Sequence, residues 1–144
     1  MSYTRDMLDA APTGVPLDAE DVAAAIDACL ACLQSCTSCA DSDLAEEDVA
    51  DLATCAALCL NCADVCDVTA RLLSRPAHWE RFVVYRLLAA CVRTCTDSAE
   101  ECHKHARHHR HCAICEKVCR ACIEACNAVL DDETFEELQN LAGA

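Results

Sequence analysis

Glycine, proline and aromatic residues are scarce in this sequence. Its 144 residues include only two Gly, three Pro, one Trp, two Tyr and two Phe. Because Gly and Pro mark turns and break helices, their scarcity argues against sheets or disorder and favours long helices. The apolar share is 54%, but much of it is Ala and Cys. We therefore expect a thin hydrophobic core, unless the cysteines themselves line it.

Basic charge is also scarce, and no segment resembles a targeting or membrane sequence. The chain has 11 Lys and Arg against 25 Asp and Glu, for a net charge of −14. This balance excludes nucleic acid as a partner, since phosphate neutralisation needs clustered basic residues, and it disfavours anionic membrane surfaces. No run of 18 apolar residues predicts a membrane span. Residues 1–6 lack a basic-then-apolar signal pattern, so we expect a cytoplasmic protein with no membrane partner.

Cysteine, in contrast, is abundant, with 16 residues. A short chain this rich in cysteine is usually secreted and stapled by disulfides. In a reducing compartment, sixteen thiols indicate metal ligands more readily than disulfides. Cysteines one helical turn apart also point the same way, which suits a shared metal better than disulfide geometry.

Polar and helix-breaking residues divide the sequence into four long helices. We expect them over residues 19–40, 44–73, 77–105 and from just after 107 to 130. Asp18 is typical of an N-cap, residues 41–43 predict a turn, and residues 74–76 break the second helix. Long helices with short connections imply an all-α fold, an antiparallel up-down-up-down four-helix bundle.

The bundle leaves a short extension at each end of the chain. We divide the sequence into an N-terminal extension (1–17), a metal-binding bundle domain (18–130) and a C-terminal extension (131–144). Met7 and Leu8 could dock a short helix in the first extension. Phe135, Leu138 and Leu141 would share one face of a short helix in the second.

The cysteines recur at alternating steps of three and four residues. This is the spacing of the core-facing seam on a helix in a bundle, so cysteine takes the positions where Leu and Ile normally sit. One seam position of the third helix holds Ser98 instead. By helix, the cysteines are Cys29, Cys32, Cys36 and Cys39; Cys55, Cys59, Cys62 and Cys66; Cys91, Cys95 and Cys102; and Cys112, Cys115, Cys119, Cys122 and Cys126.

Antiparallel packing sorts these positions into layers. Residues at one height on two antiparallel helices have residue numbers with a constant sum, and the seams of all four neighbouring pairs obey this rule to within one. The four layers are Cys29/Cys66/Cys91/Cys122, Cys32/Cys62/Cys95/Cys119, Cys36/Cys59/Ser98/Cys115 and Cys39/Cys55/Cys102/Cys112. At about 5 Å between layers, the bundle should be a tube lined with thiols.

Soft thiolates bind Cu(I), Zn(II) and iron–sulfur clusters, and the net charge that each would leave in the core distinguishes between them. A protein interior cannot hold sixteen uncompensated thiolates. Four isolated Zn(II) sites would leave the core strongly negative, whereas roughly one Cu(I) per thiolate, with bridging sulfurs, brings it near neutrality. We expect several Cu(I) ions per chain. The alternatives are a zinc or mixed soft-metal thiolate store and, with less support, an iron–sulfur electron carrier.

The thiols do not resemble the reactive cysteines of an enzyme. A redox enzyme needs one or two low-pKa thiols beside a cation or a helix N-terminus. Here the thiols are many, equivalent and expected to be buried. We therefore expect a binding protein with no catalytic residues.

The two ends of the tube differ in character. Beyond the Cys29 layer, the register passes Cys126 and reaches a closed end formed by Val22, Leu73, Val84 and Val129. Beyond the Cys39 layer, the residues are polar and rich in imidazole, and neutral imidazole is an exchangeable metal ligand. We predict a metal access site at this end. Its candidate residues are His105 and His108, which the register points inward, together with His103, His109, His111 and Asp43.

The cysteine motifs resemble those of a known family. The resemblance rests on the motifs Cys29-x-x-Cys32-x-x-x-Cys36-x-x-Cys39, Cys55-x-x-x-Cys59-x-x-Cys62-x-x-x-Cys66, the third-helix cysteines and Cys112-x-x-Cys115-x-x-x-Cys119-x-x-Cys122-x-x-x-Cys126. Over about residues 18–130 they resemble the four-helix-bundle copper storage proteins of the cytosolic type. The resemblance implies storage of many Cu(I) ions, usually in a homotetramer, with a copper chaperone as a conceivable donor. Exported members have a methionine-lined mouth, whereas this chain has only two Met and clusters histidines instead.

Overall fold

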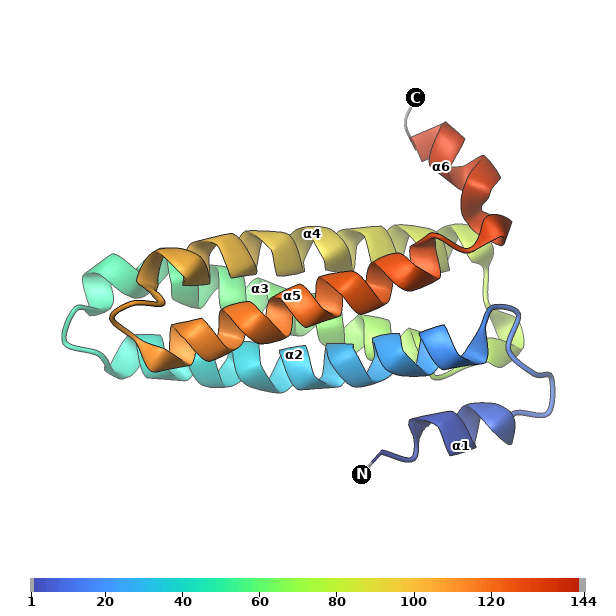
Figure 1. The fold of residues 1–144 in the computed structure, drawn as a ribbon, viewed down its shortest axis with the longest axis horizontal. Helices are drawn as coiled ribbons and strands as arrows, with labels where there is room; N and C mark the ends of the chain where they lie inside the picture. Colours follow the sequence, from blue (N-terminus) through green and yellow to red (C-terminus); the bar gives the residue numbers. More distant parts are fainter. Residues whose placement is uncertain (1, 143–144) are drawn as a thin grey trace.

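The computed structural model of the protein is all-helical over the residues that it describes, 2–142, with the side chains of residues 139, 141 and 142 left out (Figure 1). Its α-helices and 3-10 helices (η) are α1 (Thr4–Asp9), α2 (Ala19–Ala45), α3 (Val49–Leu73), η1 (Pro76–His78), α4 (Arg81–His105), α5 (Arg110–Leu130), η2 (Glu133–Phe135) and α6 (Glu136–Ala142). The long helices α2 to α5 alternate in direction. The predicted antiparallel up-down-up-down bundle is confirmed.

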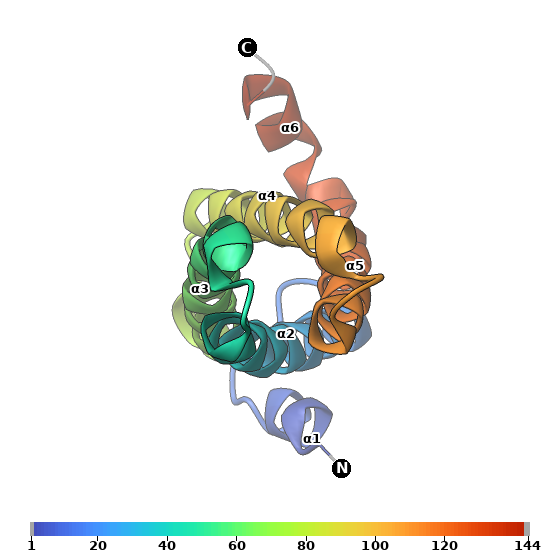
Figure 2. The same cartoon turned by 90° about the vertical axis from the view of Figure 1, so that its left-hand side faces the viewer.

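The four long helices form a closed ring around one axis. Helix α2 packs against α3 and α5, and α4 completes the ring by packing against the same two helices (Figure 2). The connections 46–48 and 106–109 lie together at one end of the bundle, which we call the mouth. The connection 74–80 lies at the opposite end. Each helix therefore presents one seam to a common interior.

Local capping sets where two of these helices begin. The Asp18 carboxylate accepts the backbone N–H of Asp21 at 3.0 Å, as expected for the predicted N-cap of α2. Helix α4 begins at Arg81 rather than near residue 77, because Pro76 opens a 3-10 turn and the Glu80 side chain caps α4. That carboxylate accepts the N–H of Val83 at 3.0 Å.

The turn predicted at residues 41–43 is wrong. Helix α2 continues to Ala45, and α3 begins only at Val49. Asp43 lies three residues beyond Ala40 and four beyond Cys39, so it continues the seam and is fully buried instead of lying in a turn. An Asp inside a helix costs about 0.7 kcal/mol relative to Ala, which packing against the neighbouring helices offsets.

Helices α2 and α3 are long and apolar enough to cross a membrane on length and composition alone. Much of that hydropathy comes from the cysteines and alanines that face the bundle interior. The core helices of a water-exposed bundle give the same pattern, so the two helices are weak evidence for a membrane.

The end opposite the mouth is closed by apolar side chains. Val22, Leu73, Val84 and Val129 are all buried there, as the register predicts. The C-terminal extension lies beyond them and forms η2 and α6 (Figure 1). Within it, Phe135 and Leu138 are buried, and the Phe135 ring lies 5.6 Å from that of Tyr85, while the side chain of Leu141 lies outside the described residues. Metal is thus not expected to pass through this end.

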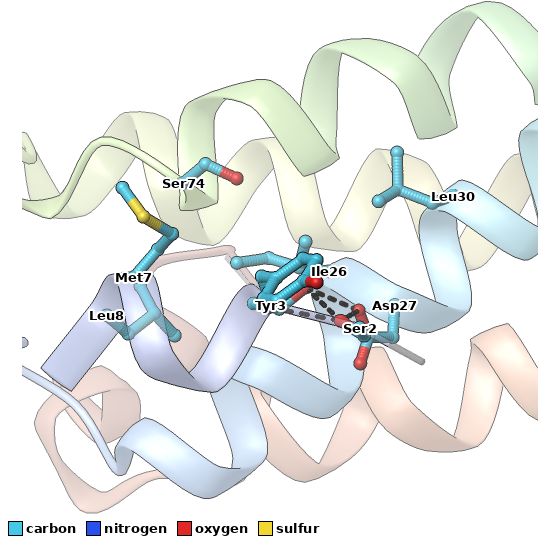
Figure 3. A pocket seen from close by; sticks show the side chains of 9 residues that line it. Ser2, Tyr3, Met7, Leu8, Ile26, Asp27, Leu30 and Ser74 are labelled. Atoms are coloured by element: carbon cyan, nitrogen blue, oxygen red, sulfur yellow. Dashed lines mark hydrogen bonds between the residues drawn. The ribbon is translucent and has the colours of Figure 1, made fainter.

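Helix α1 docks on the outer face of α2, away from the thiols (Figure 3). The hydroxyls of Ser2 and Thr4 donate to the Asp27 carboxylate at 2.8 and 2.6 Å. Leu8 is buried, whereas Met7 is largely exposed along a groove of about 520 Å³ that also reaches Leu30. The short helix expected in the N-terminal extension is therefore present.

Candidate metal-binding site

All sixteen cysteines are buried and none is in a disulfide. Four, four, three and five of them come from α2, α3, α4 and α5. The alternating spacing keeps each set on one helical face, and the ring of helices turns those faces toward one axis. The thiols thus form the core that large aliphatic side chains form in ordinary bundles.

The predicted layers are present in the structure. In the Cys29 layer, the Cys29 sulfur lies 3.8 Å from that of Cys91 and 3.7 Å from that of Cys122. In the Cys32 layer, the Cys32 sulfur lies 3.7 Å from the sulfurs of Cys62 and Cys119. The constant-sum rule therefore gave the correct height for these positions on every helix.

Contacts between layers are as short as contacts within them. The Cys36 sulfur lies 3.6 Å from that of Cys119, and the Cys59 sulfur lies 3.7 Å from that of Cys102. At the closed end, Cys126 joins the series through Cys29 at 3.9 Å. The sulfurs form one continuous column, in which a metal can share ligands with its neighbours above and below.

Ser98 occupies the one seam position without sulfur, as the sequence predicts. Its hydroxyl is buried and lies 3.5 Å from the sulfurs of both Cys59 and Cys119. The Cys36 sulfur lies 3.8 Å away on the opposite side. A hydroxyl is a poor ligand for a soft metal, so the column is interrupted on the α4 wall at this height.

The spacing of the sulfurs fits metal coordination without rearrangement of the backbone. Four sulfurs at about 2.3 Å from a central ion lie about 3.8 Å from one another. The cysteine sulfurs in contact lie 3.5–4.0 Å apart. Two of the groups whose ligand atoms all approach within 4.8 Å are Cys29/Cys66/Cys91/Cys122 and Cys39/Cys59/Cys102/Cys115.

The described core contains no Lys or Arg to compensate thiolates. The buried polar or charged side chains among the described residues are Asp43, Thr69 and Ser98. Thiols therefore share protons: hydrogen bonding from Cys126 and Cys29 lowers the pKa of Cys122, and hydrogen bonding to Cys122 raises the pKa of Cys66. Full ionisation of the column requires bound cations.

At the mouth, the column ends in a mixed set of ligand atoms, which we call the mouth tetrad: Cys39, Asp43, His111 and Cys112. The His111 Nδ1 atom lies 3.3 Å from the Cys39 sulfur and 3.6 Å from the Cys112 sulfur. The Cys112 thiol donates to the Asp43 carboxylate at 3.6 Å. Burial raises the pKa of Asp43 to about 6.

Carboxylates from the 46–48 connection hold the histidines of the mouth in place. The His111 Nε2 atom lies 3.1 Å from a Glu46 oxygen, so its Nδ1 atom faces the thiols. His109 lies 2.9 Å from Asp48, and this hydrogen bond raises the pKa of His109 and lowers that of Asp48. The two connections at the mouth are thereby fastened together.

The inward orientation predicted for His108 is wrong, whereas His105 is half-buried at the end of α4. His105 bonds to Glu101 at 3.0 Å, and His108 is exposed. The register fails here because α4 ends at His105 and residues 106–109 do not continue it, so His111, in the first turn of α5, faces the thiols. The available signal was its spacing of four residues before Cys115, which places both on one helical face.

The remaining histidine of the cluster, His103, faces away from the tube. Its Nδ1 atom lies 3.0 Å from the Glu116 carboxylate, and its side chain is largely exposed. The mouth tetrad, in contrast, can be reached from outside through a surface groove of about 190 Å³ between α2 and α5. That groove is lined by Ser35 and Ser38 and touches Cys39 and His111.

Comparison with known proteins gives one family and several similar structures. The model of the family described as Csp, copper storage protein, matches residues 18–131. A curated relative from Bacillus subtilis (strain 168), described as uncharacterized cysteine-rich protein YhjQ, is 30% identical over 106 residues, covering 74% of this chain and 93% of that protein. The family model thus covers all four long helices.

Solved structures from Streptomyces lividans share the fold. One is the copper storage protein Ccsp loaded with 10 copper equivalents, at 41% identity and a TM-score of 0.86, covering 88% of this chain and 97% of the other. Another, described as copper loading to a cytosolic copper storage protein with five coppers, is 43% identical with a TM-score of 0.76, covering 77% and 92%. The similarity thus includes most of both chains.

Proposed function

The chain belongs to the copper storage protein family, and on this premise we propose that it holds Cu(I) on its sixteen thiols inside the bundle. The observation that carries this proposal is the continuous column of buried thiols in mutual contact. Each Cu(I) replaces one thiol proton, so filling the column leaves the interior close to neutral. Ions held there are shielded from water, which suits storage and buffering. A count of Cu(I) bound per chain tests the proposal.

The proposed ligands are all sixteen cysteines. Cu(I) accepts two or three sulfur ligands, and the short contacts within and between layers offer such sets along the whole column. Ser98 is excluded by its hydroxyl. No catalytic step is included, because the thiols are many, buried and chemically alike, unlike a single activated nucleophile.

Zinc storage is a second candidate, supported by the Cys29/Cys66/Cys91/Cys122 group. Its four sulfurs lie at distances that suit a tetrahedral ion. A four-thiolate Zn(II) site retains two negative charges, however, and four such sites in one dry column would repel one another. Bridged Cu(I) avoids this accumulation of charge. An iron–sulfur electron carrier has less support, because the column isolates no single cluster site.

We propose the mouth as the route by which copper reaches the thiols. The His111 side chain is 22% exposed, yet its Nδ1 atom contacts Cys39 and Cys112, so it can pass an ion inward. Asp43 lies beside it and supplies negative charge. His109 positions the mouth through Asp48. The imidazoles of His103, His105 and His108 lie outside the tetrad and would gather Cu(I) near the opening.

A loading experiment tests this route. His111→Ala should load Cu(I) more slowly in stopped-flow measurements while final capacity changes little, because the sixteen thiols remain. His78→Ala, which removes an exposed imidazole at the end of the bundle opposite the mouth, is the matched control and should load at nearly the wild-type rate. Loading of the His111 variant at the wild-type rate would remove this residue from the route. The double variant His105→Ala, His108→Ala tests the outer histidines in the same assay.

The chain would work in the cytoplasm. A similar Streptomyces lividans protein is described as cytosolic, and free thiols persist in reducing compartments. A copper chaperone is a suitable donor, because ligand exchange between thiolates keeps Cu(I) bound throughout the transfer. Family resemblance supports a homotetramer, and exposed apolar residues such as Phe82 and Val83 could contribute to its interfaces.

We also propose a division of the chain by role. Residues 18–130 would form the metal-binding domain, since all the thiols and the mouth lie within them. Residues 1–17 and 131–144 would be extensions that hold no metal. Their buried residues, Leu8 and Phe135, pack against the outside and the closed end of the bundle.

A further inference from the structure

We propose that the mouth tetrad binds one divalent cation, Zn(II), before the thiol column takes up Cu(I). Cys39, Asp43, His111 and Cys112 offer two sulfurs, one nitrogen and one carboxylate oxygen, all within 4.8 Å of one another. Zn(II) takes ligands of these three types, usually four at a time in a tetrahedral arrangement. The inference depends on the tetrad alone and not on how copper is stored.

The distances in the tetrad already match a tetrahedral ion. Zn(II) with bonds of about 2.3 Å to sulfur and about 2.0–2.1 Å to nitrogen or oxygen holds its ligand atoms about 3.3–3.8 Å apart. The Cys39 and Cys112 sulfurs lie 3.9 Å apart, and the His111 Nδ1 atom lies 3.3 and 3.6 Å from them. The Asp43 Oδ1 atom lies 3.6 Å from the Cys112 sulfur and 3.7 Å from His111 Nδ1. Binding would therefore need little movement.

A carboxylate outside the tetrad orients its histidine as in protein zinc sites. Histidine ligands commonly donate their second N–H to a carboxylate, which fixes the tautomer and makes the ligating nitrogen more basic. The His111 Nε2 atom lies 3.1 Å from Glu46 Oε1, leaving Nδ1 as the acceptor that faces the sulfurs. Glu46 is thus a positioning residue for the site.

Asp43 supplies an independent sign of a cation site. The residue is fully buried, and its Oδ2 atom has no hydrogen-bond partner. An unpaired buried carboxylate oxygen is costly, and a cation bound beside it would remove that cost. A carboxylate oxygen is a harder ligand than sulfur and suits Zn(II) better than Cu(I).

The chemistry of binding balances simply. Zn(II) displaces one proton from each of the Cys39 and Cys112 thiols, and two protons leave to solvent. Neutral His111 and ionised Asp43 complete the site without further proton release. The ion then occupies the two outermost sulfurs on the α2 and α5 sides of the mouth, so incoming Cu(I) must displace it. The bound ion would close the mouth of the tube until Cu(I) replaced it.

Cobalt(II), a spectroscopic substitute for Zn(II), tests the site in the reduced full-length apo protein under anaerobic conditions. The first equivalent should give the visible bands of tetrahedral Co(II), with sulfur-to-metal charge transfer weaker than that of a four-thiolate site. Asp43→Asn should weaken this first equivalent by roughly 100-fold, because an amide oxygen replaces a charged ligand. Zn(II) competition against a chromophoric chelator should show the same loss.

Asp41→Asn is the matched control, since it removes the same charge from an exposed position two residues away on α2. It should leave Co(II) affinity unchanged. If Asp43→Asn does not fold by circular dichroism, Glu46→Gln provides a second test and should weaken the first equivalent by about 10-fold, with exposed Glu47→Gln as its control. The Cu(I) count per chain is measured separately for each variant, because a low count with intact Co(II) affinity would contradict copper storage and not this proposal.

Two results would overturn the inference. One is an equal affinity for the first Co(II) in the Asp43 and Asp41 variants, or in the Glu46 and Glu47 variants if those are used. The other is a four-thiolate spectrum for that first equivalent, because the inner sulfurs would then be the preferred divalent site.

Discussion

Ser98 is the seam position of the interior that carries a hydroxyl in place of a thiol. The residue is surrounded by the sulfurs of Cys36, Cys59 and Cys119, and it differs from cysteine by one atom. We expect Ser98→Cys to fold normally, because the seam position already accepts a side chain of this shape, and to keep or raise the Cu(I) capacity. Metal analysis after anaerobic loading measures this.

Ala57→Cys is a suitable control for that variant, since it adds a thiol at an exposed position of α3. Its stored Cu(I) should stay at the wild-type value after washing with a chelator. A Ser98 variant that does not fold would show that the α4 wall is not as described.

Asp43 makes the stability of the apo protein depend on pH. Burial raises its pKa from 3.8 to about 6, so the folded chain holds a proton that the unfolded chain releases. The stability associated with this proton is present below the lower value and is lost as pH rises through about 6. Asp43→Asn removes this dependence. The Tm of the reduced apo variant should exceed that of wild type at pH 7.5 and approach it at pH 4.5.

Asp41→Asn controls for the change in net charge in that comparison. Its Tm should follow that of wild type at both pH values. A lower Tm for Asp43→Asn than for wild type at pH 7.5 would mean that the ionised carboxylate stabilises the apo mouth.

At the scale of the element, the long seams could be predicted from the sequence, whereas the helix ends could not. The alternating spacing of three and four residues persists over many helical turns. One seam position that lacks cysteine, such as Ser98, therefore does not obscure which residues face the interior. Asp43 was placed in a turn because short polar side chains usually cap helices, but here packing extends α2 by another turn. Extrapolation through residues 106–109 failed because a non-helical turn resets the phase, which moved the inward position to His111.

Helix α1 is attached to the bundle by hydrogen bonds at its start and by the buried Leu8 near its end. Asp27→Ala removes the acceptor for the Ser2 and Thr4 hydroxyls, which are exposed hydrogen bonds worth about 1 kcal/mol each or less. We expect α1 to become more sensitive to proteases and its amides to exchange faster, while Cu(I) capacity is unchanged. Asp64→Ala, at an exposed position on α3, should cause neither change. Unaltered protection of α1 in the Asp27 variant would show that Leu8 alone secures it.

At the scale of the whole molecule, the fold separates a thiol interior from an acidic exterior. We expect the protein to meet copper as a folded container. Alanine-rich helices and the apolar end layer support this state. The reduced apo protein should therefore be mainly helical by circular dichroism, and loading should change its metal content far more than its secondary structure.

Counting Cu(I) per chain is the most direct test of copper storage in the thiol column. Reduced apo protein is titrated anaerobically with Cu(I), and both bound metal and released protons are measured. The account predicts on the order of one Cu(I) and one released proton per thiolate, with sixteen thiols available. Saturation at four ions or fewer per chain, or loss of copper to a weak chelator, would contradict it.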